Sequence, residues 1–163
     1  MYTLERIATF MNRLLMWLAS CILGAMILLT CGNIFLRLFW MPVKGTFELM
    51  GYGGAVIMAF ALGMTQLERG HIAVDVLFMR FSKRAQRILT AVNDIILCVF
   101  FAIVSWQVAN YATILLKTGE VTETLRIIYY PFTYGVALGC AMLALVLLTH
   151  FLKTLSQKEE SNK

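Results

Sequence analysis

Charged residues are scarce in this sequence. Asp, Glu, Lys and Arg together make up 14% of its 163 residues, hydrophobic residues make up 60%, and the mean hydropathy is +0.78. Soluble domains carry roughly a quarter charged residues. The composition therefore excludes an ordinary soluble domain and indicates an integral membrane protein.

Motifs for catalysis and metal binding are also missing. The sequence has no Walker loop, no zinc-ligand spacing, no C-x-x-C pair and no serine-histidine pair on a soluble segment. The cysteines lie inside apolar runs, where small buried side chains are expected: Cys21, Cys31, Cys98 and Cys140. We therefore expect a protein that is not an enzyme and that holds no cofactor or metal of its own.

The two histidines leave one cofactor hypothesis open. His71 and His150 are both expected near the same membrane surface, so a bis-histidine haem in the membrane anchor of a respiratory oxidoreductase is an alternative. Membrane haem ligands usually lie deeper, and Gly70 and Asp75 are typical of a loop around His71. A visible haem spectrum would identify such an anchor.

Four apolar runs are long enough to cross a bilayer, which takes roughly 20 residues of helix. They cover about residues 14–36, 45–67, 94–116 and 127–149. The first run holds 23 uncharged residues, more than the apolar part of a secretory signal, and is expected to stay in the protein. With residues 1–13 as an amphipathic lead-in on the membrane, the sequence predicts one all-α membrane domain over residues 1–163.

Basic residues are distributed unevenly between the segments that flank these runs. Ten lie in the N-terminus, the second connection and the C-terminus, whereas the first and third connections hold four, Arg37, Lys44, Lys117 and Arg126. Since cytoplasmic segments carry the excess of Lys and Arg, both termini are expected in the cytoplasm. The net charge of +5 reflects this topology, and its dispersed distribution does not indicate nucleic-acid binding.

The second connection contains an amphipathic pattern over about residues 73–88. On a helical wheel, apolar side chains between Val74 and Ile88 gather on one arc. The opposite arc is basic and consists of Arg80, Lys83, Arg84 and Arg87. The pattern predicts a cytoplasmic-side interfacial helix that binds anionic membrane lipids. The alternative is that this segment forms the lower part of the third transmembrane helix.

Small residues recur within the second and fourth runs. Every fourth residue is small in the row Gly51, Ala55, Ala59 and Gly63, and the fourth run contains Gly135 and Gly139. Such rows let helix backbones approach closely in a membrane. We expect both rows to pack against other helices, either of this chain or of a partner.

Several charged residues are expected near the ends of the spans. Glu48 opens the second span and has two interpretations: an ion pair with Lys44 or Arg37, or a contact to another subunit. Glu120 and Glu123 lie in the third connection and are exposed to a partner in this topology. Asp94 opens the third span, where an ion pair with Arg84 or Arg87, a helix-start role and a functional role remain open.

The chain shows no internal repeat and no cluster of acids at the membrane midplane, features expected of a self-sufficient transporter or pump. Four spans with small-residue faces favour an accessory subunit. A small exporter that works as a homodimer is a further alternative, and it would move solute when reconstituted alone.

The sequence resembles the small membrane subunit of tripartite ATP-independent periplasmic (TRAP) transporters over nearly its full length. The resemblance rests on Arg37 at the end of the first span, Pro42 in a short turn, and Thr46 and Glu48 at the start of the second span. It continues into the stretch GMTQLERGHIAVDVL, which contains Gly63, Gly70, His71, Ile72, Val74 and Asp75.

The resemblance implies a partner and a setting. Such subunits brace a large multi-span subunit that binds substrate and sodium and moves them by an elevator-like motion. A soluble periplasmic protein delivers the substrate, typically an organic anion with a carboxylate such as sialic acid or a dicarboxylate, and docks on the outer faces of both membrane subunits. The implied location is the bacterial inner membrane.

The resemblance does not supply a substrate site. No residue here matches one that the family would use to coordinate substrate or sodium, so the sequence does not identify the anion. The candidate contacts to the binding protein are the charged residues expected on the outer side, namely Arg37, Lys44, Glu48, Glu120 and Glu123. The third connection, including Glu120 and Glu123, follows no motif of the family, and its contact with the binding protein rests on topology.

Overall fold

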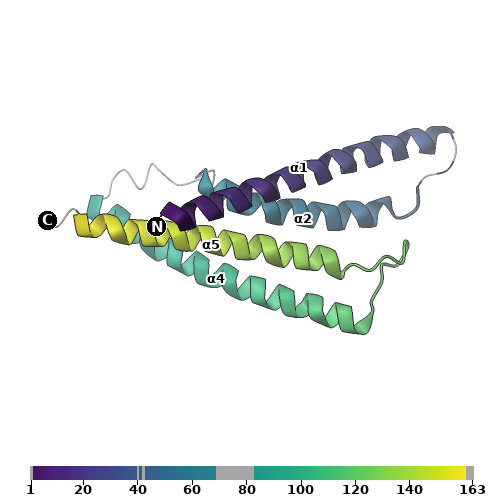
Figure 1. Cartoon of the computed structure of the whole chain (residues 1–163). Helices are drawn as coiled ribbons and strands as arrows, with labels where there is room; N and C mark the ends of the chain where they lie inside the picture. Colours follow the sequence, from purple (N-terminus) through teal and green to yellow (C-terminus); the bar gives the residue numbers. More distant parts are fainter. Residues whose placement is uncertain (1, 40, 42, 69–82, 161–163) are drawn as a thin grey trace.

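The computed structural model of the chain (Figure 1) describes all residues except 1, 40, 42, 69–82 and 161–163. Its helices are α1 (Tyr2–Phe39), α2 (Thr46–Leu67), α4 (Lys83–Thr118) and α5 (Tyr130–Glu160). Each contains a stretch that is long and apolar enough to cross a membrane. By length and composition, the predicted all-α fold with four membrane-spanning helices is confirmed.

The first helix is longer than predicted. Residues 1–13 were expected to form a separate lead-in on the membrane surface, but α1 runs without a break from Tyr2 to Phe39. No Pro or Gly interrupts the chain between Tyr2 and Leu23, so nothing ends the helix there. Ala8 and Asn12 are also buried inside the protein. The prediction of a separate membrane-surface segment over residues 1–13 is therefore wrong.

The interfacial helix predicted over residues 73–88 falls mostly outside the described residues. From Lys83 to Ile88 the chain forms the first turns of α4 and continues directly into the third span. For these six residues the structure supports the alternative, a lower part of the third transmembrane helix. Residues 73–82 lie outside the described part of the chain.

Both ends of the described chain lie at the same end of the molecule. Figure 1 shows the start of α1 and the end of α5 together, and the α1–α2 and α4–α5 connections together at the opposite end. We call these the terminal end and the loop end. The arrangement agrees with an even number of spans, while the placement of the terminal end in the cytoplasm stays a prediction.

The four helices lie side by side in the order α1, α2, α5, α4 (Figure 1). The largest fully buried side chains belong mainly to α4 and α5, namely Leu115, Leu143, Val146 and Leu147. A second cluster joins α1 to α2 and contains Leu15, Ala19, Val56 and Phe60. Because α1 and α4 form the edges of the row, most of their apolar side chains remain exposed, and lipid or a partner must cover them.

Polar side chains fix α4 against α5. Ser105 donates a hydrogen bond to the carbonyl of Ala137 at 2.8 Å, and the hydroxyls of Thr113 and Tyr134 lie 3.0 Å apart. Such interhelical hydrogen bonds are favourable in an apolar environment, where an unpaired hydroxyl is costly. They therefore hold the two helices in register.

Candidate functional site

The small-residue row of α2 does not form one face. Four residues advance a helix about 40° beyond a full turn, so the row turns by roughly 120° between Gly51 and Gly63. A Cβ at Gly51 would meet nothing within 4 Å, and Ala55 is exposed. Ala59 and Gly63 are buried against other helices. The row begins on the outer surface and ends inside the protein.

The buried half of the row packs against α5 and α1 of the same chain. A Cβ built on Gly139 would lie 2.5 Å from the carbonyl oxygen of Ala59, so the α2 and α5 backbones are nearly in contact there. One turn away, a Cβ built on Gly135 would lie 3.3 Å from Cγ2 of Val56. Gly63 lies against the side-chain oxygen of Asn12. Gly51 and Ala55 are the members of the row that face away from the other described helices of the chain.

Sequence reasoning missed Gly53 and Asn12. A Cβ at Gly53 would lie 2.8 Å from the sulfur of Met26, so this glycine also permits a close contact between α1 and α2. Gly53, Val56, Phe60 and Gly63 are all buried and follow the spacing of one helical face. The periodicity of the whole helix, rather than the row of every fourth residue, would have found this face.

Glu48 joins the two connections at the loop end. Its carboxylate accepts hydrogen bonds from the backbone N–H groups of Thr124, at 2.7 Å, and Leu125, at 3.2 Å. Among the described residues it forms no ion pair with Lys44 or Arg37, which are both exposed. The expected ion pair is therefore absent there, and Glu48 serves instead as an acceptor for a loop 76 residues further along the chain.

The loop that Glu48 holds has a defined shape. Thr122 is buried, accepts the N–H of Arg126 at its carbonyl, and accepts the N–H of Ile127 at its hydroxyl. A short bridge joins Val121 to Ile128. The side chain of Leu125 packs over Gly45, which has a positive φ of 78° and no room for a side chain. The two connections thus form one interlocked surface.

Stacked aromatic residues from α2, the second of the two connections and α5 pack next to this surface. The ring of Tyr129 stacks on Tyr52 at 5.5 Å, and Tyr52 also stacks on Phe132 at 5.8 Å. The hydroxyl of Tyr129 donates a 2.6 Å hydrogen bond to Glu120. That hydrogen bond, followed by burial and the charge of Glu120, raises the pKa of Tyr129 to about 12. Glu120 and Glu123 are both exposed, but only Glu120 accepts this hydrogen bond from Tyr129.

The other predicted site residues are placed as follows. Arg37 lies in the last turn of α1 at the loop end, and Asp94 is buried on α4. Lys83, Arg84 and Arg87 lie in the first turns of α4. The remaining residues lie outside the described part of the chain, namely Gly70, His71, Asp75 and Arg80.

Side chains that could hold a metal do not gather in the described part of the chain. There, no three His, Cys, Asp or Glu residues lie close enough together for a metal ion. All four cysteines are free. The prominent features are helix contacts and an ordered loop surface.

These features define a class of protein: a multi-pass, all-helical membrane protein whose outer helices, α1 and α4, expose most of their apolar side chains. Comparison with known families matches residues 26–157 to the family described as tripartite ATP-independent periplasmic transporters, DctQ component. The chain belongs to this family, a membrane component of three-part transporters. No curated protein and no solved structure matches the chain.

Proposed function

We propose that the chain is the non-catalytic small subunit of a TRAP secondary transporter in the bacterial inner membrane. It braces a large, sodium-coupled elevator subunit and helps a periplasmic binding protein to dock during uptake of a carboxylate-bearing organic anion. The family match over residues 26–157 is the observation that carries this proposal. Sodium and substrate are bound by the large subunit in this proposal.

The exposed side of α2 supports contact with a large subunit. Gly51 and Gly54 have open space where a Cβ would stand, Ala55 is exposed, and Met58 is 76% exposed. Small residues in a membrane helix allow a second helix to approach its backbone, and a methionine adapts to the surface of a neighbour. This patch is the partner face that we propose, in place of Ala59 and Gly63.

Substitutions can separate partner contact from folding. Ala55→Leu places bulk on the exposed patch without a clash inside the chain, so it should lower recovery of the large subunit while the chain itself folds normally. Leu28→Ala on the exposed surface of α1, 75% exposed, serves as a control. Helix content and size-exclusion behaviour of the isolated chain report folding. Unchanged recovery with Ala55→Leu would contradict the proposed face.

The loop end supports docking of the binding protein. In the predicted topology it faces the periplasm, and it presents Lys44 and Glu123 on the interlocked surface that Glu48 maintains. Rim charges of this kind mainly change association rates. Glu123→Lys and Lys44→Glu should therefore raise the binding-protein concentration needed for half-maximal uptake, with recovery of the large subunit unchanged.

Reconstitution tests the whole proposal. A tagged chain should recover one large hydrophobic protein, and only the pair, with its binding protein and a sodium gradient, should take up an organic anion into liposomes. Transport by the chain alone would identify a self-sufficient exporter. A haem spectrum in the purified chain would identify a respiratory anchor.

A further inference from the structure

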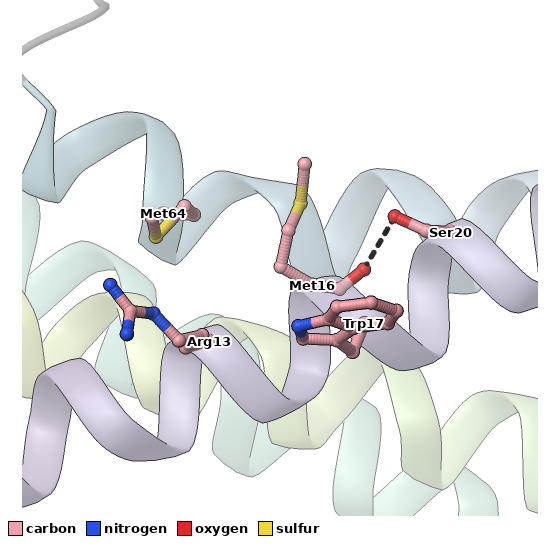
Figure 2. Close-up of a pocket in the computed structure, with 5 residues that line it drawn as sticks. All are labelled: Arg13, Met16, Trp17, Ser20 and Met64. Atoms are coloured by element: carbon pink, nitrogen blue, oxygen red, sulfur yellow. Dashed lines mark hydrogen bonds between the residues drawn. The ribbon is translucent and has the colours of Figure 1, made fainter.

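A groove opens on the side of the protein between α1 and α2, toward the terminal end. It has a volume of about 360 Å³ and is lined by Arg13, Met16, Trp17, Ser20 and Met64 (Figure 2). We propose that this groove binds the phosphate and upper acyl chain of one phospholipid. The proposal concerns this chain alone and does not depend on the identity of the large subunit.

The charge of the groove favours a phosphate. Arg13 is exposed, and among the described residues it forms no ion pair, although Glu68, the C-cap residue of α2, follows Met64 by one turn. Figure 2 shows the indole nitrogen on the edge of the Trp17 ring nearer Arg13. A guanidinium and an indole N–H are both donors, and neither can accept a hydrogen bond. The pair therefore suits an anionic group rich in oxygen.

The remaining walls favour an acyl chain. Met16 and Met64 line the groove, and their flexible thioether side chains can adapt to an irregular apolar ligand. The hydroxyl of Ser20 already donates a 2.9 Å hydrogen bond to the carbonyl of Met16, so it does not compete for the ligand. Donors at one end and an apolar wall along the side match an amphipathic molecule better than free phosphate.

The position along α1 matches the head-group region. Arg13 directly precedes the uncharged run Leu14–Leu36, whose 23 residues span about 35 Å as a helix. The hydrocarbon core of a bilayer is roughly 30 Å thick. Arg13 thus lies near one boundary of the core, at the level of lipid phosphates, with Trp17 one turn deeper. Basic pockets between transmembrane helices at this level are suited to lipid head groups.

The test uses the purified full chain in mild detergent. Native mass spectrometry should detect one retained phospholipid per chain, and titration with phosphatidylglycerol should refill the chain after delipidation. In Arg13→Gln, affinity for the added lipid should fall roughly tenfold, because a charge-assisted hydrogen bond to phosphate is lost. Arg13→Lys should retain part of the affinity.

Matched variants make the result specific. Arg37→Gln removes the same charge from the same helix at the opposite end of the uncharged run, and it should leave lipid retention unchanged. Trp17→Phe keeps an aromatic ring but removes the N–H, so it should weaken binding less than Arg13→Gln. Ser20→Ala should have no effect, since its hydroxyl is engaged within the helix.

Three outcomes would overturn the proposal. Equal losses in Arg13→Gln and Arg37→Gln would show general attraction of lipid to basic residues. Competition by inorganic phosphate as strong as that by phosphatidylglycerol would show a site for the ion alone. Unchanged lipid retention together with poorer recovery of the large subunit in Arg13→Gln would show that a protein partner occupies the groove. Circular dichroism of each variant checks that the helices remain intact.

Discussion

The side-chain oxygen of Asn12 points at the one face of Gly63 where any other residue would carry a Cβ. Asn12 is fully buried, its amide nitrogen donates to the carbonyl of Ala8 at 2.9 Å, and its oxygen has no N–H or O–H donor among the described residues. The Cα–H group of Gly63 is a weak donor to this oxygen. The contact brings α1 and α2 close together near the terminal end.

Gly63→Ala should destabilise the chain by about 1–3 kcal/mol, since the added methyl group displaces a buried amide that has little room to move. Unfolding of the purified chain in mixed detergent micelles measures the loss. Asn12→Ala in the same chain should recover part of the stability by removing the overlapping atom. Gly51→Ala is the control: its Cβ meets nothing within 4 Å, so no loss is expected.

Gly139→Ala should be more damaging than Gly63→Ala. Its methyl group meets the backbone of Ala59, which cannot rotate away as a side chain can, so α2 and α5 must separate. Ala59→Gly removes only the side chain and should therefore restore little of the stability. The same unfolding measurement ranks the two glycine variants, and full rescue by Ala59→Gly would disprove the backbone contact.

Glu48→Ala should loosen the 119–129 connection while leaving the four helices intact. Hydrogen exchange should accelerate at the Thr124 and Leu125 amides, which donate to the carboxylate, and much less at Arg126, which donates to the carbonyl of Thr122. Glu48→Gln keeps one acceptor oxygen and should give a smaller effect. Equal exchange at Thr124 in all three proteins would show that the carboxylate does not hold the loop.

Tyr129 should titrate late in alkaline solution. Its pKa rises from 10.0 to about 12 because its hydroxyl donates to Glu120. A raised folded-state pKa stabilises the protonated form, so this contribution is complete below pH 10 and is lost as the pH rises toward 12. Difference absorbance of the phenolate, compared between the native chain and Tyr129→Phe, isolates this residue. Glu120→Gln should move the transition toward ordinary values.

The spans were predictable because hydrophobicity and length decide them locally, as the agreement of α2 with residues 45–67 illustrates. The small-residue row was only half informative, since a spacing of four drifts around the helix and carries Gly51 and Ala55 away from Ala59 and Gly63. The carboxylate of Glu48 could be expected to need an interaction, but its donors lie 76 and 77 residues away. No local pattern encodes that pairing.

Asn12 was difficult to recognise for a related reason. It lies beside Arg13 at the border of the apolar run, where a polar residue is ordinarily solvated. Its burial depends on the missing side chain of Gly63, a residue of another helix. The groove at Arg13 and Trp17 could not be predicted from the sequence for the same reason. One of its lining residues, Met64, belongs to another helix, α2.

The Glu48 contact also has a mechanical consequence. A force applied to the 119–129 connection reaches α5 through the chain itself and α2 through the carboxylate of Glu48. These two helices lie in the middle of the row, and their backbones meet again at Ala59 and Gly139. A force from a docked protein would therefore be transmitted to two helices that are in contact with each other, and it would deform the loop little.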